Sequence, residues 1–83
     1  MYKDKLGVPS EHTLNKIKSS NEQHGGRDTD IYSYEEKNTK GVIIATYVVS
    51  DSTSIYSPQS RTVLFYKYDL NGDEIKSGKM QVN

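Results

Sequence analysis

The sequence predicts an α+β domain, in which one short N-terminal helix packs on a four-stranded antiparallel β-meander made of two hairpins. A serine that follows a proline begins a segment with spaced apolar residues, which is typical of a helix start. Four later segments are rich in Tyr, Val, Ile and Thr, as strands are. A turn sequence at 38–41 joins the first two of these segments, and another at 71–72 joins the last two.

The expected helix covers residues 10–20 and follows a lead-in over residues 1–9. Ser10 can cap the free N–H groups of a first helical turn. Leu14 and Ile17 are three residues apart, so they would share one helix face. Two apolar positions in about ten residues make a marginal helix. We therefore expect this helix to depend on contact with the sheet.

The first hairpin is expected from residues 30–37 and 42–49. The second of these strands is apolar at both alternating positions, which predicts a central strand buried on both faces. A four-residue turn at 38–41 gives the following opposite pairs: Lys37 with Val42, Tyr34 with Ala45, and Tyr32 with Tyr47.

The second hairpin is expected from residues 62–68 and 74–82. The Asn71-Gly72 step between them is a strong signal for a tight hairpin turn. A Ser-rich segment, residues 51–60, joins the two hairpins. The antiparallel sheet is thus expected within residues 30–83, and the 83 residues form a single domain, 1–83.

Composition excludes several classes of function. Lys and Arg number 11 and Asp and Glu number 11, so no net charge attracts a nucleic acid. The chain has no cysteine, which excludes disulfides and thiolate metal sites. The longest apolar run, 42–49, is too short to span a membrane. We expect a protein partner, no nucleic acid, no membrane span and no cofactor.

The two histidines are the main residues that would support an enzymatic function. His12 and His24, with Asp28 and Asp30, are the candidate ligands of a metal-dependent hydrolase. Their spacing matches no standard metal-binding pattern, and surface positions explain both histidines more simply. We predict no catalytic residue, no metal site and no enzymatic activity.

Aromatic residues supply the candidate partner-binding positions, which are Tyr32, Tyr34, Ile55 and Tyr56. Tyr32 and Tyr34 share one face of an expected strand, where they form either a docking surface or part of a thin core. Ile55 and Tyr56 lie in the connecting segment, where apolar residues either fold back over the core or contact a partner.

The order of elements resembles a known family. The Ser10-capped segment, the aromatic Tyr32-Ser33-Tyr34, and Thr62 to Phe65 leading into 69–75 are similar to small outer-membrane lipoproteins of the SmpA/OmlA type. Those proteins are accessory to barrel assembly. The resemblance implies a non-catalytic scaffold in the bacterial periplasm or envelope, although this chain lacks the lipidated Cys.

These observations lead to one functional prediction with alternatives. We expect a small, non-enzymatic protein-binding module, with the soluble domain of an envelope lipoprotein as one version. An inhibitor or immunity-type protein of a mobile element is the alternative, and a metal-dependent hydrolase is a further one. An exposed sheet edge would also allow a homo-dimer.

Overall fold

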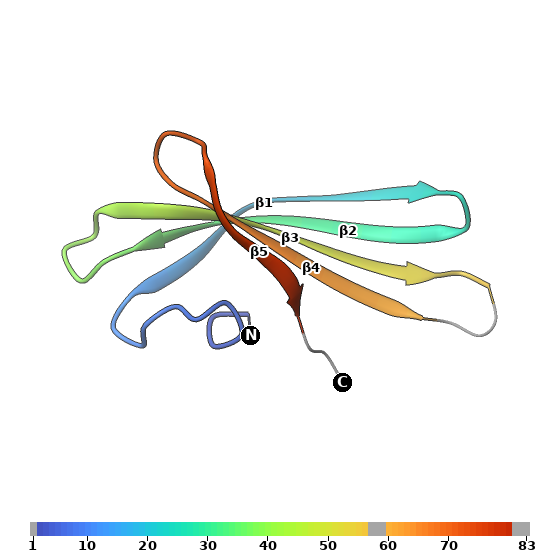
Figure 1. Cartoon of the computed structure of the whole chain (residues 1–83), viewed down its shortest axis with the longest axis horizontal. Helices are drawn as coiled ribbons and strands as arrows, with labels where there is room; N and C mark the ends of the chain where they lie inside the picture. Colours follow the sequence, from blue (N-terminus) through green and yellow to red (C-terminus); the bar gives the residue numbers. More distant parts are fainter. Residues whose placement is uncertain (1, 57–59, 81–83) are drawn as a thin grey trace.

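The chain forms one antiparallel sheet, as seen in a computed structural model that describes residues 2–56 and 60–80 (Figure 1). The strands are β1 (Thr13–His24), β2 (Arg27–Lys37), β3 (Ile43–Ser54), β4 (Arg61–Tyr68) and β5 (Glu74–Met80). Each strand pairs with the next along the chain, so β1 and β5 are the sheet edges. The described residues contain no helix, and the fold is an all-β meander of five strands.

The predicted α+β class is therefore wrong, because most of the segment 10–20 belongs to β1 and not to a helix. Leu14 and Ile17 give a helix too little apolar surface, and the Ser and Thr residues around them have low helix propensity. Gly25 and Gly26 have φ values of 55° and 78°, which suit a two-residue hairpin turn. That turn brings β1 beside β2, whose backbone groups satisfy those of β1.

The predicted first hairpin is present as β2 and β3, but its register differs from the expected one by one residue next to the turn and by two residues beyond a bulge. The observed opposite pairs are Tyr34 with Tyr47, Tyr32 with Val49, and Lys37 with Ile43. A bulge next to Lys37 leaves Ile44 as an extra residue. The shift of two residues keeps the side chains beyond the bulge, from Ala45 to Val49, on their predicted faces.

The predicted second hairpin is confirmed as β4 and β5, although the last two residues of the expected strand 74–82 lie outside the described residues. Gly72 has a φ of 87° and ends a three-residue hairpin loop, 70–72, whereas Asn71 has no positive φ, so the turn is not the expected two-residue Asn-Gly type. The Asp69 carboxylate accepts hydrogen bonds from the backbone N–H groups of Asn71 and Asp73. These bonds fix the turn at the predicted place.

The core lies on one face of the sheet, which we call the covered face. Its cover is the N-terminal strap, residues 2–12, drawn in dark blue on one side of the sheet (Figure 1). The buried apolar residues are Tyr2, Leu6 and Val8 from the strap and Ala45, Tyr47, Val49, Val63, Phe65 and Met80 from the sheet. The lead-in predicted over residues 1–9 is thus, in its described part, a layer of the core.

The other face, which we call the open face, has no cover among the described residues. The prediction that residues 42–49 are buried on both faces is accordingly wrong. Thr46 and Val48, which point to the open face, are half-exposed. Tyr47 and Val49, which alternate with them and point to the covered face, are buried. An 83-residue chain with one strap supplies a second layer for only one face.

Candidate protein-binding surface

The open face is ordered in three rows that run across all five strands. Residues directly opposite each other on neighbouring strands share a face, so the register defines the rows. The first row is Ser20, Ile31, Ser50, Leu64 and Lys79, the middle row is Lys18, Ser33, Val48, Tyr66 and Ser77, and the third row is Asn15, Glu35, Thr46, Tyr68 and Glu74.

The centre of the open face is apolar, aromatic and hydroxylated. On β2, β3 and β4 these rows carry a single charge, that of Glu35, and its carboxylate lies 3.5 Å from Nζ of Lys37. The other charges lie on the edge strands, at Lys18, Glu74 and Lys79. An apolar centre with aromatic residues, surrounded by a charged rim, is the arrangement found in protein–protein interfaces.

Each apolar side chain in this centre is half-exposed: Ile31, Val48, Leu64, Tyr66 and Tyr68. Next to them, Ile75 is exposed. It is the extra residue of a bulge in β5, between Glu74, which opposes Tyr68, and Lys76, which opposes Lys67. By its alternation with Lys76, Ile75 lies on the open face and extends the apolar surface toward the β4–β5 turn.

The covered face contains the one buried charged side chain among the described residues. Glu36 is 3% exposed, and its Oε1 accepts a hydrogen bond of 2.6 Å from the Tyr47 hydroxyl. Its Oε2 lies 2.6 Å from Nδ1 of His12 in the strap. Burial raises the pKa of Glu36, but the bonds from His12 and Tyr47 lower it more, and the net shift is downward.

Tyr47 responds in the opposite sense. Burial raises its pKa, and the hydrogen bond to Glu36 raises it further, because that bond needs the hydroxyl proton. Tyr47 thus stays neutral and donates, while Glu36 stays ionised and accepts. This network holds the strap on the covered face, which leaves the open face as the larger unoccupied surface.

A second polar contact stabilises the far end of the covered face. The Arg61 guanidinium binds the Asp51 carboxylate through both oxygens, with Nε–Oδ1 of 2.9 Å and Nη2–Oδ2 of 2.7 Å. The hydrogen bond from Arg61 is the main reason that the pKa of Asp51 is lowered. The pair joins β3 to β4 and offers no free ionised group for chemistry.

Two of the predicted partner-binding residues lie on the covered face. The ring centroids of Tyr32 and Tyr34 are 6.3 and 6.1 Å from that of Tyr2, and 6.5 Å from each other. Nζ of Lys16 lies 5.3 Å from the centre of the Tyr32 ring. These contacts show that Tyr32 and Tyr34 hold the strap; whether they also bind a partner stays a prediction.

The other two predicted residues lie where β3 ends, beside the β1–β2 turn. Ile55 is 57% exposed and Tyr56 is 67% exposed. The backbone N–H of Ile55 donates to the carbonyl of Gly26, and the Tyr56 ring covers the Cα of that glycine so closely that a Cβ would lie 2.1 Å from it. Ile55 and Tyr56 therefore have exposed side chains, while a hydrogen bond to Gly26 holds the backbone of Ile55 in place.

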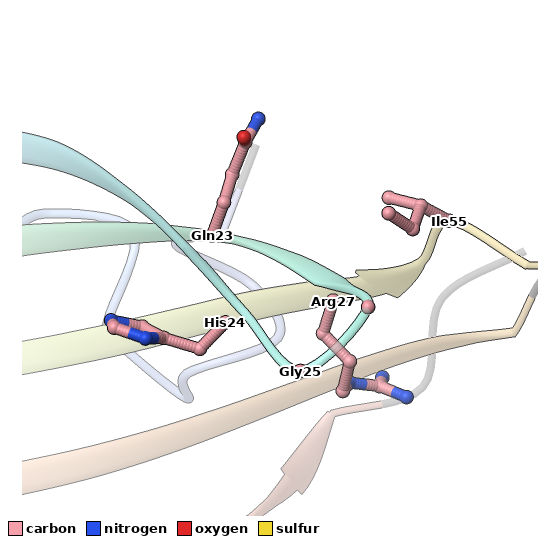
Figure 2. A pocket seen from close by; sticks show the side chains of 6 residues that line it. Gln23, His24, Gly25, Arg27 and Ile55 are labelled. Carbon is pink, nitrogen blue, oxygen red and sulfur yellow. The ribbon is translucent and has the colours of Figure 1, made fainter.

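A hollow of about 170 Å³ lies at this end, lined by Gln23, His24, Gly25, Gly26, Arg27 and Ile55 (Figure 2). The side chains of Gln23 and His24 point in different directions, as adjacent strand residues do. Arg27 is engaged elsewhere, because its Nε donates to the Ser52 hydroxyl at 2.7 Å. The hollow thus has few side-chain groups that converge on a ligand.

The candidate metal ligands do not come together. His12 contacts Glu36, while His24 is exposed at the β1–β2 turn with Asp28 on the neighbouring strand. Asp28 and Asp30 both accept hydrogen bonds from the Asn21 amide, at 2.7 and 2.8 Å. Within residues 2–56 and 60–80, no three His, Asp or Glu side chains are grouped so that they could hold a metal ion.

Comparison with known proteins gives no relative: no family model, no curated protein and no solved structure matches this chain. Of the features behind the lipoprotein resemblance, the strand–turn–strand of β4 and β5 is present, but the helix from Ser10 is not. Among the residues described, no helix has the length and apolar character needed to cross a membrane.

Proposed function

We propose that this protein is a non-enzymatic protein-binding module and that the open face is its binding surface. The observation that carries the proposal is the uncharged centre formed by Val48, Leu64 and Tyr66 and their neighbours, with charges at the rim. Protein interfaces are depleted in charge at their centre and enriched in Tyr. Tyr and Ser side chains add contact area and adaptable hydrogen bonds at low entropic cost.

The rigidity of the sheet also supports the proposal. The side chains of the centre project from three paired inner strands, and the strap fixes the opposite face of the same strands. Groups that are already held in place lose little conformational entropy on binding. A preformed, nearly uncharged surface therefore suits a protein partner better than it suits a small polar substrate.

The proposal is tested by capturing partners on immobilised protein and identifying them by mass spectrometry. Leu64→Glu places a charge in the centre of the open face, and Leu70→Glu is the matched control, since Leu70 is 66% exposed in the β4–β5 turn. We expect a defined partner to bind wild type and Leu70→Glu but not Leu64→Glu, with circular dichroism showing that both variants fold. Equal capture by all three proteins would refute the proposal.

The second predicted site is examined in the same experiment with Tyr56→Ser. A partner lost with Tyr56→Ser but kept by Leu64→Glu would assign binding to the end of β3 and not to the open face. This outcome would keep the protein-binding function and reject its proposed location.

A further inference from the structure

We propose that the open face is occupied by a second copy of this chain, packed face to face so that two sheets form a sandwich. This inference rests on the proposed function, because it names the partner of the same surface. Three observations carry it: the missing layer, the size of the face, and the symmetry of its residues.

The missing layer is the first observation. Protein domains consist of two or more packed layers around an apolar core, and a sheet that is apolar on one side needs a layer there. The strap provides that layer on the covered face, but the described part of the chain provides none on the open face. A second copy of the same twisted sheet supplies an apolar layer, as in sandwiches whose sheets lie about 10 Å apart.

The size of the face is the second observation. The two longest dimensions of the molecule are 46 and 24 Å. These dimensions include the strap and the turns, so the footprint of the open face is at most on the order of 1,000 Å², compared with about 800 Å² per partner in a stable protein–protein interface. A specific dimer therefore needs nearly complete overlap of the two faces. The net charge of zero also means that two copies do not repel each other.

Symmetry is the third observation. A two-fold axis along the middle row would place Val48 and Tyr66 on their own counterparts in the second copy. It exchanges the first and third rows, so Leu64 meets the second copy's Tyr68, and Lys79 meets the second copy's Glu74. Leu64 and Tyr68 then form an apolar contact, and the opposite charges of Lys79 and Glu74 meet at the β5 rim.

The same axis leaves two imperfect pairs. Lys18 lies in the middle row on edge strand β1, so it meets the second copy's Lys18, and these like charges at the exposed rim oppose the contact. Ile31 meets the second copy's Glu35, but the Glu35 carboxylate is already near Lys37 of its own chain. The aliphatic part of Glu35 can therefore lie against Ile31 while its charge stays with Lys37.

The first test is the mass of the protein in solution, measured by sedimentation equilibrium over a range of concentrations. Wild type and Leu70→Glu should be dimers, and Leu64→Glu should be a monomer. A monomeric wild type up to millimolar concentration overturns the second-copy inference, whereas the proposed function is then judged separately by the capture experiment.

A charge exchange tests the geometry of the dimer. Lys79→Glu should weaken dimerisation about tenfold, because it places like charges together at two symmetric positions. The double variant Lys79→Glu/Glu74→Lys should restore wild-type dimerisation. Residues 74 and 79 are about 16 Å apart along β5, so the rescue has to come from contact between copies. Absence of rescue overturns the proposed axis.

Cross-linking separates this dimer from pairing at a sheet edge. The chain has no cysteine, so Ser33→Cys places a single thiol in the middle row of the open face. Ser19→Cys is the matched control, because Ser19 opposes Tyr32 on the covered face of edge strand β1. A short bis-maleimide should link Ser33→Cys and not Ser19→Cys. Linking only at Ser19→Cys would show edge pairing and overturn the inference.

Discussion

The hydrogen bond from Tyr47 to Glu36 yields a quantitative prediction for the substitution Tyr47→Phe. This change removes one hydroxyl and keeps the ring, so packing on the covered face is preserved. Tyr47 is 1% exposed, and its bond to the Glu36 carboxylate is 2.6 Å long. The substitution leaves a buried, ionised oxygen without its donor.

The expected loss of unfolding free energy is about 2 kcal/mol, since hydrogen bonds to charged groups contribute about 1.5–3 kcal/mol. For a domain of this size, that loss lowers the Tm by roughly 10 °C. The total stability of such a domain is on the order of 5 kcal/mol, so the variant remains folded but is clearly weakened.

Urea unfolding followed by circular dichroism measures the effect, with Tyr56→Phe as control because Tyr56 is exposed. The control should stay within about 0.5 kcal/mol of wild type. A double-mutant cycle with Glu36→Gln measures the interaction energy between Tyr47 and Glu36. The losses of stability in the two single variants should not be additive. If Tyr47→Phe is as stable as wild type, the hydrogen bond does not stabilise the fold. If the two losses add, Tyr47 and Glu36 are not energetically coupled.

The pH dependence follows from the lowered pKa of Glu36. A carboxyl whose pKa is lower in the folded than in the unfolded chain stabilises the fold above the unfolded value, which is about 4.3. This contribution is lost as the pH falls through the folded pKa. The difference between wild type and Tyr47→Phe should thus be constant above about pH 5 and shrink below about pH 4. A difference that grows in acid would contradict this assignment.

Two further substitutions test the strap and the β1–β2 turn. Leu6→Ala should cost about 2–4 kcal/mol in urea unfolding, because Leu6 is 4% exposed, whereas Leu70→Ala should cost less than about 0.5 kcal/mol. Equal costs would show that the strap does not pack on the sheet. Gly26→Ala and Gly25→Ala should both cost about 1 kcal/mol, because both positions have positive φ. Only Gly26→Ala should displace the Tyr56 ring, and unchanged ring resonances in its NMR spectrum would refute the contact.

Local signals in the sequence predicted the hairpins better than they predicted the first strand. Asn71-Gly72 determines its own turn, so the β4–β5 hairpin needed no distant information. The β2–β3 hairpin kept its faces but not its register, since alternation with a period of two does not distinguish a shift of two residues. The deciding bulge at Ile44 has no local signature in this sequence.

The strap and β1 were mispredicted because distant contacts determine both. Tyr2, Leu6 and Val8 have no regular spacing, so their burial follows from the sheet that they cover. The single hint was their apolar character in an otherwise polar start. Edge strand β1 is polar along most of its length, and the pairing with β2 that defines it cannot be seen in a short window.

The contrast between β1 and the inner strands connects the sequence to the proposed surface. From Lys18 to His24, β1 is exposed and every residue is polar, although Ile17 at the bulge of β1 is also exposed, at 56%. On the open face of the inner strands, Val48, Leu64 and Tyr66 are also in contact with solvent, yet they are apolar or aromatic. Hydrophilic side chains at these positions would leave the covered core unchanged, so the stability of the monomer does not require apolar ones. Their burial by another surface would add free energy in proportion to the apolar area removed from water. The apolar character that suggested two buried faces for residues 42–49 is thus not satisfied within the described chain, and the proposed second layer on the open face would satisfy it.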